Sequence, residues 1–276
     1  MTEVLRYTAF SSDPTGGNPA GVVLDATGLT DNDMQKIAAD VGYSETAFAI
    51  PDGPRHYRVR YFSPLAEVAF CGHATIATAV ALAERTGTGD LLFDTPAGPI
   101  TLRTSGGDAI TAGFTSVPAR SRPATEDELS QTLDALRWSR DDLAPAWPPH
   151  VAFAGNDHLV LAAATRDRLA RLDYDFDRLA GVMREHGWTT VHLFHAQDEN
   201  VVHARDPFPV GGVVEDPATG AAAAAFGGYL KALGKVTEPR RLTIVQGEDM
   251  GRRSELLVDV HPGDERVTIT GTATRL

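Results

Sequence analysis

Two carboxylates and a histidine occupy positions at which the sequence could support acid/base chemistry. Glu45 comes shortly after Gly42, which ends an expected helix, and it opens a segment that becomes apolar at once. A carboxylate there is expected to be partly desolvated, which is the setting in which a Glu can exchange protons near neutral pH. A surface Glu at the start of a strand is the alternative interpretation. His73 and Asp216 are the other candidates, because each lies at or just before the start of a long apolar segment.

Both long apolar segments are expected to be helices, over 73–85 and 219–231. The first follows Phe70-Cys71-Gly72, and the second follows Glu215-Asp216-Pro217-Ala218. Backbone N–H groups and the helix dipole at such starts favour an anion, and a substrate carboxylate is the natural ligand. If two halves of the chain face each other, both helix starts point into one cleft. In the alternative interpretation, Pro217 is only a favourable first residue for a helix and the glycines only permit turns.

The cysteine and histidine content limits which metal or disulfide sites are possible. Cys71 is the single cysteine, so an intrachain disulfide framework and a Cys-based metal cluster are excluded. A thiol at a helix start can be reactive, but we interpret Cys71 as a small packing residue. His192, His195 and His203 do not indicate a metal site, since His192 and His195 would point to opposite faces of a strand. The sequence therefore predicts no metal site.

Composition and motifs exclude several classes of protein. The 276 residues carry a net charge of -12 and a pI of about 5.1, so no basic surface is expected for nucleic acid or an anionic membrane. The sequence has no G-x-G-x-x-G after a strand, no P-loop and no G-x-S-x-G, so nucleotide, flavin and serine-hydrolase functions have no support. No secretory signal and no apolar run of about 20 residues is visible. We therefore expect a cytoplasmic protein without membrane or nucleic-acid partners.

An internal duplication organises the chain. Gly17-Asn18-Pro19-Ala20 matches Gly155-Asn156-Asp157-His158 at an offset of 138 (156 − 18), and the helices ending at Gly42 and Gly187 are offset by 145 (187 − 42). Further pairs at the offset of 145 are Glu45 with Thr190, Pro64 with Pro209, and Cys71 with Asp216. In this alignment the second half has Asp where the first has Cys, which excludes a symmetric racemase with one thiol in each half.

The patterns in each half predict short strands, amphipathic surface helices and one buried helix. Thr30 is expected to cap a helix that ends at Gly42, and Thr125 with Glu128 is expected to open another. The helices over 73–85 and 219–231 are apolar or small on nearly every face, which is typical of buried helices. The predicted fold class is therefore α+β, with two pseudo-symmetric domains, each a curled, mostly antiparallel sheet around a buried central helix. The segment 117–124 is the expected linker, and strands are expected at 3–10, 20–24, 46–50, 57–62, 91–95, 99–104, 109–114, 150–154, 158–163, 190–194, 199–205, 241–246, 254–260 and 266–270.

Four motifs together resemble the PhzF-like family of phenazine-biosynthesis isomerases. They are Gly17-Asn18-Pro19-Ala20, Ser44-Glu45-Thr46-Ala47-Phe48, Cys71-Gly72-His73-Ala74-Thr75 and Glu215-Asp216-Pro217-Ala218-Thr219-Gly220. They occur in the order typical of the family, and the resemblance covers nearly the whole chain. It implies a homodimer with the two-domain fold of diaminopimelate epimerase and proline racemase. Because the last strand in this family usually returns to the first domain, the predicted domains are 1–117 with 265–276, and 118–264.

The resemblance implies a role for each matching residue. Glu45 is expected to be the acid/base that moves a proton between carbons of a small cyclic or diene amino-acid-like carboxylate, without any cofactor. His73 and Asp216 are expected to contact the substrate and assist. Hydrogen-bond donors at the helix starts would stabilise the charge that develops during the reaction. The other residues expected to bind the substrate are Asn18, Ser44, Gly72, Ala74, Thr219, Gly220 and Ala221.

Ala221 departs from the family pattern, which often has Ser after the motif that ends at Gly220. The chain therefore lacks a hydroxyl group that could bind substrate. The type reaction of the family isomerises trans-2,3-dihydro-3-hydroxyanthranilate, but because of Ala221 the resemblance does not fix this compound as the substrate of the chain. Two other functions stay open. An amino-acid epimerase or racemase would use Asp216 or His73 on the second face of the carbon, and a non-catalytic small-molecule-binding dimer would keep the site without the reaction.

Overall fold

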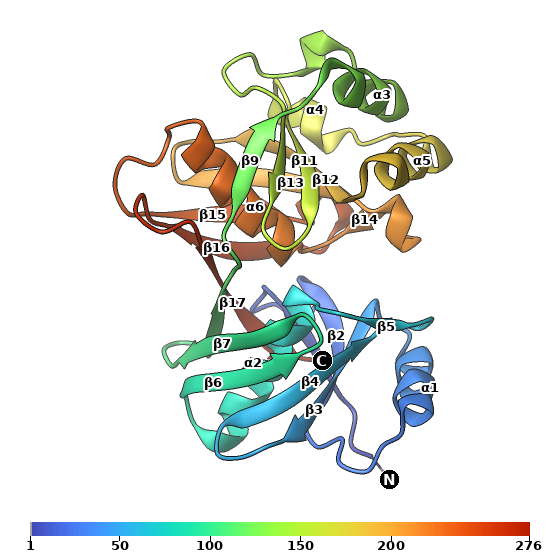
Figure 1. The fold of residues 1–276 in the computed structure, drawn as a ribbon, viewed down its shortest axis with the longest axis vertical. Coiled ribbons are helices and arrows are strands. Elements are labelled where there is room, and N and C mark those ends of the chain that lie inside the picture. Colours follow the sequence, from blue (N-terminus) through green and yellow to red (C-terminus); the bar gives the residue numbers. More distant parts are fainter. Residues whose placement is uncertain (1) are drawn as a thin grey trace. The chain divides into compact units, whose positions relative to one another are not determined.

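The computed structural model describes residues 2–276, which form two compact units (Figure 1). The first unit runs to Thr115 and also contains Thr270–Leu276, and the second unit is Ser116–Ile269. Each unit contains a curled, mostly antiparallel sheet and a buried central helix, so the predicted fold class is confirmed. Within the described residues, none of the helices combines the length and the apolar character that crossing a membrane requires.

The first unit is a closed sheet of eight strands with helix α2 (Gly72–Thr86) at its centre. The strands are β1 (Leu5–Ala9), β2 (Asn18–Val23), β3 (Glu45–Pro51), β4 (His56–Phe62), β6 (Gly89–Thr95), β7 (Gly98–Ser105), β8 (Thr111–Thr115) and β17 (Val267–Arg275), and the short β5 (Glu67–Val68) pairs with β4. The pairs β2–β3 and β4–β6 are parallel, and β17 closes the sheet by pairing with both β1 and β8. Every residue of α2 from His73 to Ala83 is buried, as a helix without a polar face requires.

The second unit repeats this plan around helix α6 (Gly220–Ala232). Its strands are β9 (Arg120–Pro123), β10 (His150–Phe153), β11 (Asp157–Ala162), β12 (Trp188–Ala196), β13 (Val201–Pro207), β15 (Arg240–Gln246) and β16 (Ser254–Val260), paired in that order, with the short β14 (Glu215–Asp216) beside β13. The pairs β11–β12 and β13–β15 are parallel. Gly227 lets α6 approach the sheet closely, because a Cβ atom there would lie 3.2 Å from the side chain of Val260 in β16 and 2.8 Å from that of Val267, which belongs to this unit although it begins β17.

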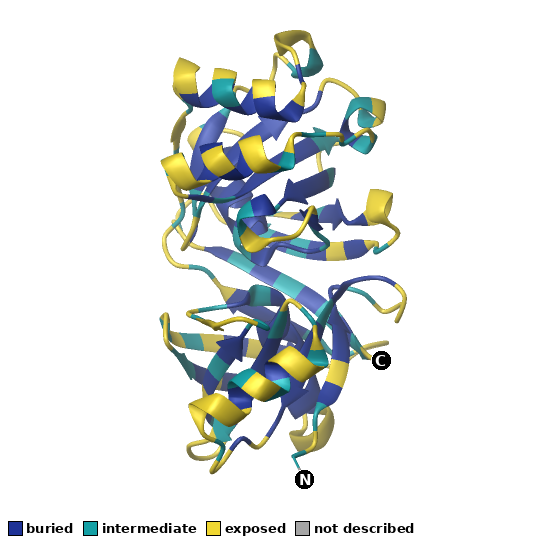
Figure 2. Cartoon of the chain, turned by 90° about the vertical axis from the view of Figure 1, so that its right-hand side faces the viewer, coloured by how far each residue is buried: buried dark blue, intermediate teal, exposed yellow. Residues whose placement is uncertain are grey.

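Amphipathic helices cover the outside of the sheets, and in Figure 2 they show buried residues on one face and exposed residues on the other. They are α1 (Asp31–Val41) in the first unit and α3 (Glu126–Leu136), α4 (Arg166–Ala170) and α5 (Phe176–His186) in the second, with short 3-10 helices η1 (Arg140–Asp142), η2 (Pro209–Gly211) and η3 (Glu248–Met250). Thr30 with Asp33, and Thr125 with Glu128, form the capping boxes of α1 and α3. The predicted starts of both helices are therefore confirmed.

Two segments differ from the sequence-based expectation. Arg120–Pro123, inside the segment expected to be a linker, form β9 and pair with β10. The prediction failed there because Arg, Ser and Pro have little tendency to form strands, and an edge position tolerates them. The last strand was expected at 266–270, but β17 continues to Arg275 through its pairing with β1.

Strand register shows the duplication residue by residue. Ala20 pairs with Glu45 in the first unit as His158 pairs with Thr190 in the second, which reproduces the offsets of 138 (158 − 20) and 145 (190 − 45). At the end of the next pair of strands, Phe62 lies opposite Glu67 as Pro207 lies opposite Glu215. The offset changes there from 145 (207 − 62) to 148 (215 − 67), because the intervening loop is three residues longer in the second unit.

This longer loop corrects one part of the sequence alignment. Cys71 precedes α2 as its N-cap, and the residue in the same place before α6 is Thr219, at an offset of 148 (219 − 71). Asp216 instead corresponds to Val68, since each ends the short strand before the central helix. Pairing Cys71 with Asp216 was therefore wrong. The second unit still has no thiol at the equivalent place, so the exclusion of a two-thiol mechanism stands on Thr219.

Candidate functional site

Glu45 is the first residue of β3, directly after the turn that ends α1. That turn depends on Gly42, which adopts the left-handed conformation with φ 73° and donates its N–H to the carbonyl of Ala38. β3 then runs parallel to β2, with Glu45 opposite Ala20. The Glu45 side chain is 18% exposed, so its carboxylate is partly desolvated but still reachable.

Cys71 and His73 meet Glu45 at the start of α2. The Cys71 thiol donates to Glu45 Oε2 over 3.5 Å, and His73 Nε2 lies 3.5 Å from the same oxygen. The two side chains also touch each other, with Cys71 Sγ 3.3 Å from His73 Nδ1. Cys71 is thus part of a polar cluster, and the interpretation of this residue as a packing residue missed its contact with the acid/base candidate.

Asn18, Pro19 and Ser44 hold the imidazole of His73 in this cluster. Asn18 Nδ2 lies 3.1 Å from His73 Nδ1, and Ser44 Oγ lies 3.4 Å from Nε2. The backbone of Pro19 also hydrogen-bonds the ring, and since Pro has no N–H its carbonyl must be the acceptor. Burial lowers the pKa of His73 below 6.5, although the charge of Glu45 and the Pro19 carbonyl act in the opposite direction. The imidazole is therefore neutral near pH 7.

The structure thus brings together four of the six predicted site residues of the first unit: Asn18, Ser44, Glu45 and His73. The other two are Gly72 and Ala74, which belong to the first turn of α2. Ala74 is completely buried, backbone included, so it is not accessible to a ligand in this structure.

The predicted residues of the second unit gather at the start of α6. Asp216 Oδ2 accepts a hydrogen bond of 2.6 Å from the Thr219 hydroxyl, and Gly220 and Ala221 open the helix. Gln246, at the end of β15, fixes this turn: its Nε2 donates to the Asp216 carbonyl and to Thr219 Oγ1, and its Oε1 accepts from the Thr219 N–H. Gln246 is completely buried. No local sequence pattern marks this residue, because its partners lie 27 and 30 residues away along the chain.

Gly247 lets the β15–β16 turn approach the Asp216–Thr219 turn. Its φ is 73°, and a Cβ atom there would lie 2.4 Å from the Arg252 carbonyl oxygen and 2.7 Å from that of Pro217. We therefore expect Gly247→Ala to destabilise the protein by about 1–3 kcal/mol more than Gly251→Ala. Gly251 is the matched control, since its φ is 74° but nothing lies within 4 Å of its Cβ position. Urea unfolding of both variants measures the difference, and equal losses would contradict the steric argument.

The counterpart of Glu45 in the second unit belongs to a sealed hydrogen-bond network. Thr190 donates to Asp206 Oδ1 over 2.8 Å and lies 2.8 Å from His158 Nδ1, while His192 Nδ1 lies 3.0 Å from Asp206 Oδ2. All four residues are at most 1% exposed. Because Thr190 uses its proton toward Asp206, its oxygen accepts from His158 Nδ1–H. The second unit therefore has a buried structural network where the first has a reachable carboxylate.

This network makes stability depend on pH. Burial lowers the pKa of His158 to about 4, against a smaller opposing effect of Asp206, while His192 lowers it further. In the unfolded chain His158 takes up a proton below about pH 6.5, but in the folded chain only below about pH 4. The contribution of neutral His158 to the free energy of unfolding is therefore fully present above pH 6.5 and decreases as the pH falls toward 4. We expect this residue alone to account for a loss of about 3 kcal/mol.

Urea unfolding of wild type and His158→Asn between pH 7.5 and 4.5 tests this dependence. Asn keeps an N–H donor for Thr190 but does not titrate, so the variant should lose less stability over this range than the wild type. Parallel pH profiles would contradict the assignment to His158.

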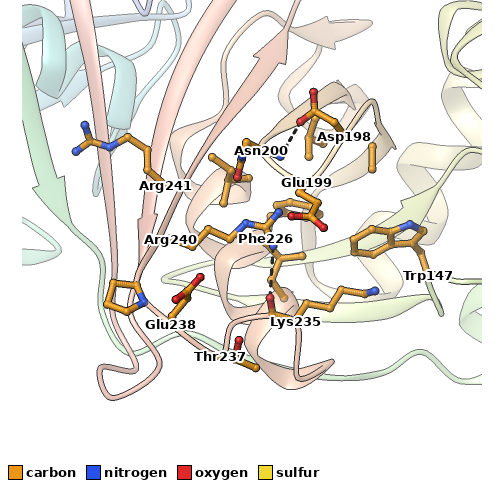
Figure 3. Close-up of a pocket in the computed structure, with 15 residues that line it drawn as sticks. Trp147, Asp198, Glu199, Asn200, Phe226, Lys235, Thr237, Glu238, Arg240 and Arg241 are labelled. Atoms are coloured by element: carbon orange, nitrogen blue, oxygen red, sulfur yellow. Dashed lines mark hydrogen bonds between the residues drawn. The ribbon is translucent and has the colours of Figure 1, made fainter.

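A cavity of about 820 Å³ also opens in the second unit, and none of the predicted site residues lines it (Figure 3). It lies between the β12–β13 turn, the C-terminal half of α6 and the start of β15. Its charged groups are of both signs. Two of them have partners within the lining: Lys235 Nζ is 4.1 Å from the centre of the Trp147 ring, and Arg240 donates to the Lys235 backbone carbonyl. It holds no carboxylate–thiol–imidazole group like that around Glu45.

Comparisons with known proteins agree with this geometry. The family described as phenazine biosynthesis-like protein, PhzC-PhzF, matches residues 7–276. The chain is 32% identical over 282 residues to the uncharacterized isomerase YddE of Escherichia coli K12, covering 98% of this chain and 95% of that one. It is 29% identical to the trans-2,3-dihydro-3-hydroxyanthranilate isomerase of Pseudomonas fluorescens, over 97% and 94% of the two chains.

A solved structure agrees as well. The phenazine biosynthesis protein of Bacillus anthracis, of the PhzF family, superposes with a TM-score of 0.88 at 27% identity, over 99% of this chain and 97% of that one. The four motifs and the two-unit fold therefore have one common explanation. The chain belongs to the phenazine biosynthesis-like PhzC-PhzF family, whose named relatives include isomerases.

Proposed function

We propose that this protein is a cofactor-independent isomerase that moves a proton between carbons of a small cyclic or diene amino-acid-like carboxylate, with Glu45 as the acid/base. The observation that carries the proposal is the partly exposed Glu45 carboxylate beside Cys71 and His73, in a family whose relatives are named isomerases. A carboxylate in that setting can take a proton from one carbon and return it to another without a second base.

The contacts of Glu45 assign different tasks to its two oxygens. Cys71 and His73 both approach Oε2, so they fix the orientation of the carboxylate. The proposal therefore gives proton transfer to Oε1. A neutral His73 also fits this role, because an imidazolium beside Glu45 would hold the carboxylate in its charged form and weaken it as a base.

The residues of the second unit have a binding role in this proposal. Asp216 and Thr219 stand before α6, whose first-turn N–H groups and dipole favour a carboxylate. Family resemblance is the support for contact between Asp216 and the substrate. Ala221 contributes no hydroxyl group to the start of α6. We therefore expect the substrate to lack the polar group that a Ser at position 221 would bind.

Turnover in D2O tests the proposed reaction. The panel contains trans-2,3-dihydro-3-hydroxyanthranilate, the compound named for the Pseudomonas fluorescens relative, together with other cyclic and diene amino acids. We expect one compound to change its ultraviolet spectrum and to gain deuterium at the carbon that receives the proton. An inverted centre with an unmoved double bond would identify an epimerase instead. A compound that binds in calorimetry but neither rearranges nor exchanges would indicate the non-catalytic binding protein.

We further propose that the protein is a homodimer, as the family resemblance implies. Light scattering after size-exclusion chromatography would give about twice the chain mass of 29.5 kDa. A mass equal to one chain at micromolar concentration would contradict it.

A further inference from the structure

Gln246 is the last residue of β15, and the backbone of the turn before α6 fixes the orientation of its side-chain amide. The backbone N–H of Thr219 can only donate, so the side-chain atom 3.0 Å away must be the amide oxygen. Nε2 therefore donates to the Asp216 carbonyl over 2.7 Å and to Thr219 Oγ1 over 3.0 Å. A flipped amide would place N–H against N–H and oxygen against oxygen at a completely buried position.

The hydrogen bonds continue from Gln246 through the Thr219 hydroxyl to the side chain of Asp216. Because Thr219 Oγ1 accepts from Gln246, its own proton is available for Asp216 Oδ2, which lies 2.6 Å away. That distance is typical of a hydroxyl group that donates to a carboxylate. Gln246 is completely buried, whereas Asp216 is partly exposed. This hydrogen-bond chain therefore connects an inaccessible amide with a carboxylate that a ligand can reach.

The duplication shows that the fold itself does not require a glutamine at this position. Strand β15 corresponds to β6 at an offset of 151 (243 − 92), because Thr243 and Leu92 hold the same place in the parallel pairs β13–β15 and β4–β6. Thr95 therefore takes the place of Gln246, and each is the last residue of its strand. Thr95 Oγ1 donates to the Gly98 carbonyl of its own hairpin over 2.7 Å. The first unit thus forms the same kind of sheet and central helix without this glutamine.

The turn held by Gln246 carries the groups to which the proposed function assigns substrate binding. Asp216 supplies its carboxylate, and the first N–H groups of α6 follow Thr219 directly. Hydrogen bonds to a ligand depend steeply on distance and angle. A turn that is already held at both Asp216 and Thr219 does not have to be ordered when the ligand binds, and this raises affinity.

We infer that Gln246 is a positioning residue for substrate binding, which acts through Thr219 to hold the Asp216 carboxylate and the start of α6 in the arrangement that binds the substrate. The binding role of Asp216 belongs to the proposed function, so the role of Gln246 rests on that proposal. Gln246 does not touch the substrate, since it is completely buried. Its loss should therefore reduce affinity and leave proton transfer by Glu45 largely intact.

Calorimetry with anthranilate tests this role without turnover, because this flat amino-carboxylate is aromatic and does not isomerise. We expect Gln246→Met to weaken the binding of anthranilate by about 10- to 100-fold. Met has nearly the length of Gln but cannot donate a hydrogen bond. The matched control is Gln197→Met, which removes an exposed amide of the same unit whose oxygen lies 2.8 Å from His203 Nε2. This control variant should bind anthranilate as the wild type does.

Thr219→Val tests whether Gln246 acts through Thr219. Val keeps the backbone N–H and nearly the shape of Thr but lacks the hydroxyl group, so we expect weaker binding in this variant as well. The double variant should bind about as weakly as Gln246→Met alone, because both changes break the same chain. Circular dichroism shows whether each variant is folded, and Thr219→Val keeps the test valid if Gln246→Met is not.

Kinetics separate a positioning role from a general loss of structure. With a compound that is turned over, Gln246→Met should raise KM by a factor similar to the loss of anthranilate affinity and change kcat little. Unchanged affinity in a folded Gln246→Met variant, or losses that simply add up in the double variant, would overturn the role of Gln246 and leave the proposed function standing. If anthranilate binds as expected but no compound of the panel is turned over, the proposed function fails alone. A wild type that binds neither anthranilate nor any compound of the panel would overturn both.

Discussion

Glu45→Gln should reduce turnover and deuterium uptake by about 10²- to 10⁴-fold, the range that a single acid/base group contributes. The amide has the shape of the carboxylate and can still accept a hydrogen bond from the Cys71 thiol, so the fold should be unchanged. It cannot take up a proton from carbon, so kcat should fall while the KM for the substrate changes little. The measurement is the initial rate of isomerisation and of deuterium uptake with the compound identified in the panel.

A matched substitution separates this effect from a general change of charge. Glu3→Gln also removes one carboxylate from the first unit, but the Glu3 side chain is 61% exposed and pairs with Arg85 at the surface. We expect wild-type rates for Glu3→Gln. A Glu45→Gln variant that isomerises its substrate at a wild-type rate would refute the role of Glu45, whatever the other residues do.

Arg205→Met should cause the largest loss of stability. Arg205 makes a two-pronged ion pair with Glu215, with distances of 2.9 and 2.5 Å, and the two side chains are only 9% and 4% exposed. Removing the Arg leaves a buried carboxylate without its partner, which costs about 3–5 kcal/mol. The double variant Arg205→Met, Glu215→Met should recover most of that loss, because no charge then remains buried. Urea unfolding measures all of these changes.

The duplication supplies the control for this experiment. Arg60 and Glu67 occupy the equivalent positions of the first unit and make the same two-pronged contact, at 2.7 Å for both pairs of atoms, but they are 26% and 35% exposed. Arg60 also pairs with Asp31, whose side chain is 81% exposed, and we expect Arg60→Met to cost about 0–1 kcal/mol for each of these exposed pairs. Equal losses of unfolding free energy for Arg205→Met and Arg60→Met would show that burial does not determine how much this ion pair contributes to stability.

Local sequence patterns were sufficient for most elements of the fold. Gly42 had to end α1, because a residue that takes the left-handed conformation there is almost always Gly. The helices around Ile76 and Phe226 had to be buried, since neither has a polar face. The close contact of Glu45 with His73 did not follow from any such pattern. The family resemblance implied a role for each of the two residues, and the structure shows that their side chains meet.

Contacts that depend on loop length or on distant partners could not be predicted in this way. Aligning the halves at a fixed offset paired Cys71 with Asp216, because three additional residues before β14 leave no local signal. Gln246 falls at the end of the strand expected at 241–246, but its role depends on Asp216 and Thr219, which lie 30 and 27 residues earlier in the chain. The Cys71 contact with Glu45 was hidden for the same reason, as 26 residues separate the two.

The closure of the first sheet by β17 has a consequence for synthesis of the chain. The first unit needs Thr270–Leu276, which are synthesised after the whole second unit, whereas the second unit is the continuous segment Ser116–Ile269. Domains usually complete folding in the order in which they are translated. Here the sheet of the first unit stays open between β1 and β8 until β17 has been synthesised, although the second unit is made later. In a chain truncated after Ile269 and released from the ribosome, we therefore expect the second unit to resist protease and the first unit to be susceptible.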